Sequence, residues 1–143
     1  MKRSWFLLGI LIIALLAAAS VLAQSEGEFR DGSGNTIGYL KDDGSVRDKS
    51  GNTVGWMKSN GEVRDRSGNT MGSIESDGDV RDRSGNRLGS VKSGSIRDKS
   101  GNTVGSVSNG YVRDKSGNTI GSAKGISDEH AAGFFFFFFS GMR

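Results

Sequence analysis

The chain has 143 residues, with 19 lysines and arginines, 16 aspartates and glutamates, a formal net charge of +3 and no cysteine. The lack of cysteine excludes disulfide bonds and thiolate metal sites, and the single histidine, His130, excludes a histidine cluster for zinc. One histidine also leaves little material for a Ser-His or Cys-His nucleophile. We therefore expect a protein that is not an enzyme, with no catalytic residue, no metal and no cofactor.

Residues 1–23 are typical of a secretory signal peptide. Lys2 and Arg3 precede an apolar run from Trp5 to Ala19, and the tripeptide V-L-A at 21–23 provides a cleavage site. We expect export to the periplasm, the cell surface or the medium, and an exported chain without cysteine fits a bacterial protein. The alternative is a retained membrane anchor, because the 19 residues from Trp5 to Ala23 can just span a bilayer.

Cleavage would change the charge of the protein. Without Lys2 and Arg3, 17 basic residues stand against 16 acidic ones, a formal charge of about +1. The two signs alternate closely along the chain, so the sequence contains no basic patch. We therefore expect no nucleic-acid partner.

Residues 26–124 repeat one short unit six times. The nonapeptide RDKSGNTVG occurs at 47–55 and again at 97–105, and its variants share the pattern R-D-x-S-G-N. The apolar residue before each Arg-Asp recurs at spacings of 17, 17, 17, 16 and 16. These apolar residues are Phe29, Val46, Val63, Val80, Ile96 and Val112. A period of this length has room for two short strands and two turns, so the sequence predicts a β-meander.

Two kinds of turn alternate along this meander. In D-x-S-G-N the aspartate side chain can accept hydrogen bonds from nearby backbone amides, and the following glycine and asparagine tolerate a left-handed backbone. The second kind includes Asn60-Gly61, Asp77-Gly78 and Asn109-Gly110, for which we predict two-residue hairpin turns with positive φ at both residues. A further glycine, such as Gly38 in T-I-G-Y-L, lies between two apolar residues and predicts a bulge that turns both toward one face.

Each unit then supplies three core side chains, which is a thin core for isolated hairpins. Closure of the meander on itself would bury all units around one axis and remove exposed strand edges. The predicted fold class is therefore all-β, a closed antiparallel meander of short hairpins in a radial arrangement. An open meander or a β-solenoid is the alternative.

The pattern of an apolar residue, R-D-x-S-G-N, an apolar residue, glycine, any residue and a second apolar residue resembles the bacterial five-fold β-flower proteins. Five complete hairpins, bounded by Ile37 to Asp48, Val54 to Asp65, Met71 to Asp82, Leu88 to Asp98 and Val104 to Asp114, would match five petals. The segments around Phe29 and Ile120 would then meet and seal the ring. The resemblance implies a fold and an exported location but no defined activity, and six-fold closure also fits the sequence.

The repeated charged residues have two possible roles each. The aspartates of D-x-S-G-N resemble the start of calcium loops, but one acid per motif is too few, so we expect them to stabilise turns. The arginines before them would form a circle on one surface of a closed ring, where they could bind anionic glycans or lipid head groups. We expect them instead to pair with aspartates of adjacent petals.

The residue after the repeated glycine breaks the repetition. It is Tyr39 and Trp56 in the first two units and serine in the other four. Two aromatic side chains on adjacent petals, opposite the core, would form a small platform for a sugar ring or a protein side chain. The alternative is that they cover the seam of the ring or pack on the N-terminal segment.

The tail, residues 125–143, departs from the repeats. Ser127 is a candidate N-cap for a short helix that would run into six consecutive phenylalanines, with Gly133 as a weak point. These are Phe134, Phe135, Phe136, Phe137, Phe138 and Phe139. We expect them to plug one end of the ring, and the alternative is contact with a membrane interface or a partner groove.

Together these features predict an exported, non-enzymatic structural or interaction module of the bacterial periplasm or cell surface. The alternative function is a carbohydrate-binding module that uses Tyr39 and Trp56. The candidate partners are a protein or a cell-surface glycan, a membrane interface contacted by the tail, and a second copy of the chain in a homo-oligomer.

Overall fold

The computed structural model describes residues 26–143. The predicted signal peptide, residues 1–23, lies outside this described part. No helix within residues 26–143 is both long enough and apolar enough to span a membrane.

The described residues form twelve short strands followed by a helical tail. The strands are β1 (Gly27–Asp31), β2 (Thr36–Leu40), β3 (Ser45–Asp48), β4 (Thr53–Met57), β5 (Glu62–Asp65), β6 (Thr70–Ile74), β7 (Asp79–Asp82), β8 (Arg87–Lys92), β9 (Ser95–Asp98), β10 (Thr103–Ser108), β11 (Tyr111–Asp114) and β12 (Thr119–Lys124). The tail contains an α-helix α2 (Asp128–Ala132), a π-helix η1 (Gly133–Phe138) and a 3-10 helix η2 (Ser140–Met142).

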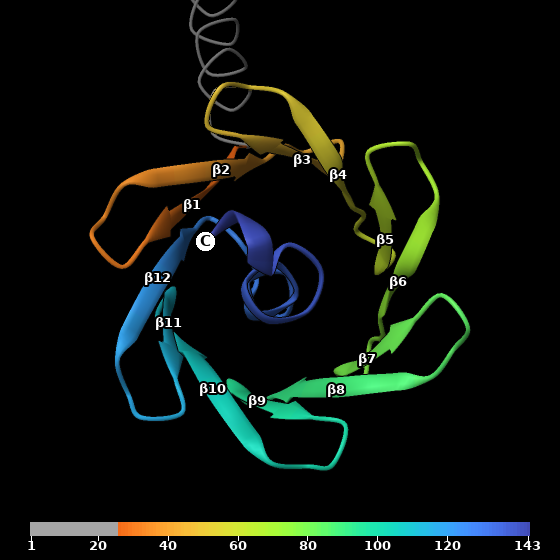
Figure 1. Ribbon diagram of the computed structural model, residues 1–143, viewed down its shortest axis with the longest axis vertical. Helices are drawn as coiled ribbons and strands as arrows, with labels where there is room; N and C mark the ends of the chain where they lie inside the picture. Colours follow the sequence, from red (N-terminus) through yellow and green to blue (C-terminus); the bar gives the residue numbers. More distant parts are fainter. Residues whose placement is uncertain (1–25) are drawn as a thin grey trace, which may run out of the picture.

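The strands close into one antiparallel ring. Each strand pairs with its neighbours in the chain, and β1 pairs with β12. The odd-numbered strand and the next one form a hairpin closed by D-x-S-G-N, which we call a petal, and these turns lie at the outer tips in Figure 1. The closed antiparallel meander predicted from the sequence is confirmed.

The ring has six petals, so of the two predicted closures the structure has the six-fold one (Figure 1). The five hairpins counted in the sequence are the connections from β2 to β3 through β10 to β11. The sixth position is the seam, where β12 pairs with β1 without a connecting turn. Phe29 lies opposite Ala123 there, just as Ile96 lies opposite Val91 across β8 and β9. The seam therefore repeats the register of the connected junctions.

The aspartate of each D-x-S-G-N turn stabilises its own turn. In the second petal, one carboxylate oxygen of Asp48 accepts hydrogen bonds from the amides of Ser50 and Asn52, both at 2.9 Å. The other accepts from the Asn52 side chain at 3.3 Å. The same three bonds occur in all six copies. The predicted turn role is confirmed.

The turns that connect one petal to the next, from each even-numbered strand to the following odd-numbered strand, explain the two repeat lengths. Asn109 and Gly110 both have positive φ, as predicted for a two-residue turn, and Ser93 and Gly94 share this conformation. The prediction was wrong for Asn60 and Asp77, because only the glycine after each has positive φ. These longer turns belong to the units of 17 residues, and the compact ones belong to the units of 16.

The core follows the predicted repeat positions. The six apolar residues before Arg-Asp have an exposed fraction of 0%. The predicted bulge is present in every petal, and in the first one Ile37 is the extra residue between Thr36, opposite Arg30, and Gly38, opposite Phe29. The bulged residue of each unit is half-buried and packs against the core.

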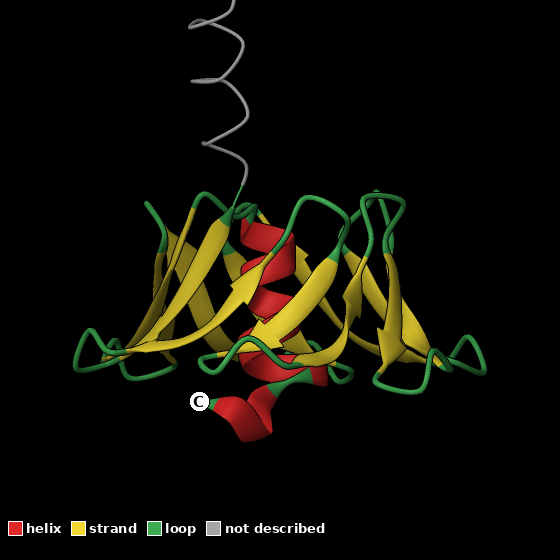
Figure 2. Cartoon of the chain, turned by 90° about the horizontal axis from the view of Figure 1, so that it is seen from above, coloured by secondary structure: helices red, strands yellow, loops and turns green. Residues whose placement is uncertain are grey.

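The tail fills the centre of the ring. The Ser127 side chain caps α2 by accepting from the His130 amide at 3.2 Å, and the helix continues through Gly133 as η1 instead of breaking there. Figure 2 shows this helical column running along the ring axis. Phe134 stacks on Phe29 with ring centroids 3.7 Å apart and planes at 6°. The tail is therefore the predicted plug.

Each of the next five phenylalanines lies against the repeated glycine of a different petal. Going backward around the ring, Phe135 lies against Gly121, Phe136 against Gly105, Phe137 against Gly89, Phe138 against Gly72 and Phe139 against Gly55. A π-helix turns less per residue than an α-helix, so consecutive side chains step closer to the one-sixth turn between petals. A Cβ on any of these glycines would collide with the aromatic ring of the phenylalanine that faces it.

This arrangement corrects the alternative role of the tail. Phe134, Phe135 and Phe139 are buried inside the ring and offer no surface to a membrane or a partner. The remaining three, Phe136, Phe137 and Phe138, are half-buried and pack against the same core.

Candidate binding surface on the outer wall

The outer wall of the ring consists of six equivalent rows of side chains. Each row crosses three neighbouring strands through residues that lie opposite one another. Its first residue precedes the apolar core position, its middle residue follows the repeated glycine, and its last residue is the repeated arginine. The rows are Glu28–Tyr39–Arg47, Ser45–Trp56–Arg64, Glu62–Ser73–Arg81, Asp79–Ser90–Arg97, Ser95–Ser106–Arg113 and Tyr111–Ser122–Arg30.

The arginines form the predicted circle, but five of the six donate hydrogen bonds within their own petals. Arg81 in addition lies 3.9 Å from the carboxylate of Glu75, which follows the last strand of the preceding petal. Arg64 donates to Glu62 at 2.5 Å and to the Gly68 carbonyl at 2.9 Å. Glu62 is two residues earlier on the same strand, and its hydrogen bond with Arg64 holds its pKa below the ordinary value. The expected pairing with aspartates of adjacent petals was wrong, because those carboxylates accept hydrogen bonds from their own turns.

Tyr39 and Trp56 occupy the middle of the first two rows. Both are half-buried and face outward, as predicted. Tyr39 lies between Glu28 and Arg47, and the Lys41 ammonium is 5.7 Å from the centroid of its ring. Trp56 is on β4, away from the seam between β1 and β12, so it does not cover the seam.

Tyr111 is a third outer aromatic residue, which the sequence analysis missed. Its exposed fraction is 52%, and among residues 26–143 no other large hydrophobic side chain is classed as exposed. It is the first residue of the sixth row, where the other rows have an acid or a serine. The signal was present in the sequence as the Y-V-R-D variant of the repeat, directly before a core valine.

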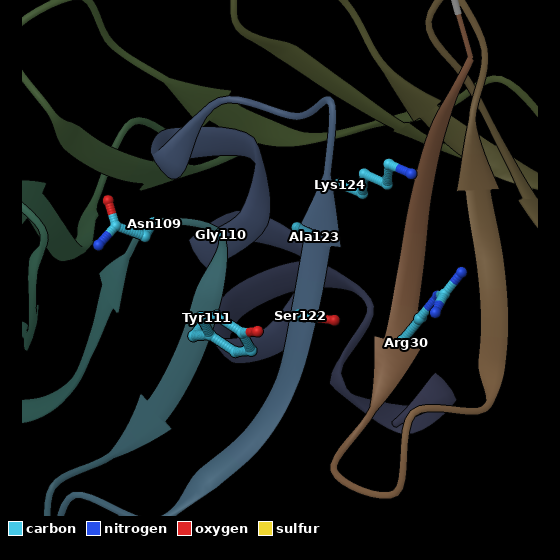
Figure 3. Close-up of a pocket in the computed structure, with 7 residues that line it drawn as sticks. All are labelled: Arg30, Asn109, Gly110, Tyr111, Ser122, Ala123 and Lys124. Atoms are coloured by element: carbon cyan, nitrogen blue, oxygen red, sulfur yellow. The ribbon is translucent and has the colours of Figure 1, made fainter.

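A groove lies on the outer wall next to Tyr111, at the seam. It has a volume of about 260 Å3, and its lining includes Tyr111, Ser122, Lys124 and Arg30. Figure 3 shows Tyr111 on β11 and Arg30 on β1 at either side of β12, which carries Ser122 and Lys124. The groove therefore combines an aromatic ring with two cationic side chains.

A comparison with known proteins assigns the family of this fold. Residues 26–139 match the family described as 5-fold beta-flower protein. The chain belongs to this family. No curated protein and no solved structure matches it. The family description gives a five-fold arrangement, whereas the ring of this β-flower chain closes with six petals.

The β-flower ring offers binding groups more readily than catalytic ones. The repeated aspartates are hydrogen-bonded within turns, and the Asn52 amide is the main cause that lowers the pKa of Asp48. Within residues 26–143 no group of three or more histidine, aspartate or glutamate side chains is placed to hold a metal ion. The outer aromatic rings and cations can stack on flat ligands and bind anions.

Proposed function

We propose that this protein is an exported, non-enzymatic interaction module of the bacterial periplasm or cell surface. The observation that supports the proposal is that the repeated charged residues and the non-repeated aromatic residues have different surroundings. The repeated aspartates and five of the six repeated arginines form hydrogen bonds within their own petals. Tyr39, Trp56 and Tyr111, in contrast, break the repetition and lie on the outer wall. A rigid ring with a filled centre holds these side chains in fixed positions.

The location is tested by expression of the full-length chain in a bacterium, followed by fractionation and intact mass measurement. Export with signal cleavage would give a chain that begins at Gln24. A full-length product in the membrane fraction would identify an anchored protein, and a full-length product in the cytoplasm would contradict export.

Carbohydrate binding through Tyr39 and Trp56 is the second candidate. The two residues lie on β2 and β4, two strands apart, which corresponds to roughly 10 Å across the sheet. Arg47, on the strand between them, lies directly opposite Tyr39 and can donate hydrogen bonds to sugar hydroxyl groups. Two aromatic faces flanking a donor suit an oligosaccharide better than a single sugar ring.

The test uses a substitution that the chain itself contains. Serine occupies the middle position of four rows, so Trp56→Ser and Tyr39→Ser should keep the fold. We expect each variant to weaken binding to immobilised neutral oligosaccharides, while Ser106→Ala, at the equivalent position of the fifth row, serves as the matched control. A fall in melting temperature without loss of binding would show that Tyr39 and Trp56 only pack.

A further inference from the structure

We propose that the groove at the seam, lined by Tyr111, Ser122, Lys124, Arg30 and Asn109, is a binding site for a sugar acid, a sugar ring that carries a carboxylate. The site lies on a different row from Tyr39 and Trp56. It therefore goes beyond the proposed function and does not depend on it.

The shape of the groove comes from the order of residues along the sixth row. Ser122 in the middle is small, and Tyr111 and Arg30 lie opposite it on the two flanking strands. In the first two rows the same middle position is filled by Tyr39 and Trp56. The volume of about 260 Å3 is below that of pockets for drug-sized ligands and suits one sugar ring.

The charge of the groove follows from a comparison with the equivalent position of the fourth row. There, Lys92 lies 3.5 Å from the Asp79 carboxylate, so the protein itself supplies the anion. The residues equivalent to Asp79 and Lys92 at the seam are Tyr111 and Lys124. Tyrosine replaces the acid, and among residues 26–143 no carboxylate lies within 4.0 Å of the Lys124 ammonium. The position of the anion is left to a ligand.

The neighbouring charges leave this cation available. Glu28 lies opposite Lys124 on β1, but its carboxylate accepts two hydrogen bonds from Arg30, at 3.0 and 3.4 Å, and one from Thr36. Arg30 and Lys124 together carry two positive charges against the one negative charge of Glu28. The groove therefore retains a net positive charge for an anionic ligand.

The aromatic ring supplies the other half of the site. The Arg113 guanidinium lies 5.9 Å from the centroid of the Tyr111 ring and restrains it from β11, and more than half of the tyrosine stays exposed. Figure 3 shows its ring directed toward Ser122. A sugar that lies over Ser122 can contact this ring on one side while its carboxylate contacts Arg30 or Lys124 on the other (Figure 3).

The experiment is a titration of the purified full-length protein with glucuronate, followed by NMR amide shifts, with glucose as the matched neutral sugar. We expect glucuronate to shift the amides of Tyr111, Ser122 and Lys124, and glucose to bind at least about tenfold more weakly. Equal affinity for the two sugars, or shifts confined to other rows, would overturn the proposal.

Two variants at one position separate the site from the fold. Tyr111→Asp recreates the Asp79 to Lys92 pair and should abolish glucuronate binding, whereas Tyr111→Phe keeps the ring and should bind within about threefold of the original protein. Tyr111 is on the surface, so both variants should melt like the original protein. Glucuronate binding by Tyr111→Asp at unchanged affinity would refute the assigned site.

Discussion

Substitution of Phe134 by alanine tests the central role of the tail. Phe134 has an exposed fraction of 0%, stacks on Phe29 at 3.7 Å and meets Phe135 edge-on at 5.1 Å. Removal of a fully buried phenylalanine ring costs about 3–5 kcal/mol, a large share of the roughly 5–15 kcal/mol by which domains are stable. The melting temperature should therefore fall by roughly 10–20 °C.

The assay is urea unfolding followed by far-UV circular dichroism, with Phe137→Ala as the control. Phe137 is half-buried, so the same chemical deletion should cost about half as much. The double variant with Phe29→Ala should show a coupling energy of about 0.5–1.5 kcal/mol for the stacked pair. A loss below about 1 kcal/mol for Phe134→Ala, or equal losses for both phenylalanines, would refute the placement of the tail in the core.

Three further predictions concern local features. Gly55→Ala should destabilise the fold by about 1–3 kcal/mol, because its Cβ would lie 2.5 Å from the backbone carbonyl oxygen of Arg64 and 2.8 Å from the Phe139 ring. Gly141→Ala, in open space, should be neutral in the same urea assay. Ser127→Ala should cost about 1 kcal/mol through loss of the N-cap, and Ser127→Asp should retain stability; equal losses would exclude the capping role. The turn aspartates with lowered pKa, such as Asp48, contribute stability that is present above their ordinary pKa and lost as the pH falls through the lower folded value. Burial also lowers the pKa of His130, so the free energy of unfolding should decline first as the pH falls below about 6.5. In a series of urea unfolding experiments at different pH, His130→Gln should remove this first decline, while the decline below about pH 4 remains.

The repeat predicted the elements of the fold well because each unit contains its own turn and strand chemistry. The aspartate turns, the bulge near Gly38 and the burial of residues such as Val63 follow from a few adjacent residues. The number of petals did not follow in the same way. It depends on β1 and β12 meeting without a turn, and a count of connecting turns does not include that junction.

The outer wall was predicted in part for a similar reason. Tyr39 and Trp56 stood out because the same position is serine in the other units. Tyr111 became visible as a candidate only when strand register placed it opposite Ser122, across the seam from Arg30. The match between individual phenylalanines and individual glycines also needs the three-dimensional path of the tail, since residues such as Phe137 and Gly89 are far apart in sequence.

The seam also bears on how the chain folds. Every other strand pairing joins neighbours in sequence, whereas pairing of Phe29 with Ala123 closes a loop of roughly 90 residues, at an entropic cost of about 4 kcal/mol. We expect the petals to form quickly and ring closure to be the slow step. The phenylalanines that fill the centre follow the last strand, so a segment synthesised after all twelve strands supplies the contacts that compensate for closure. A chain interrupted before its tail would remain an open meander with two unpaired edges, which is the state most prone to aggregation.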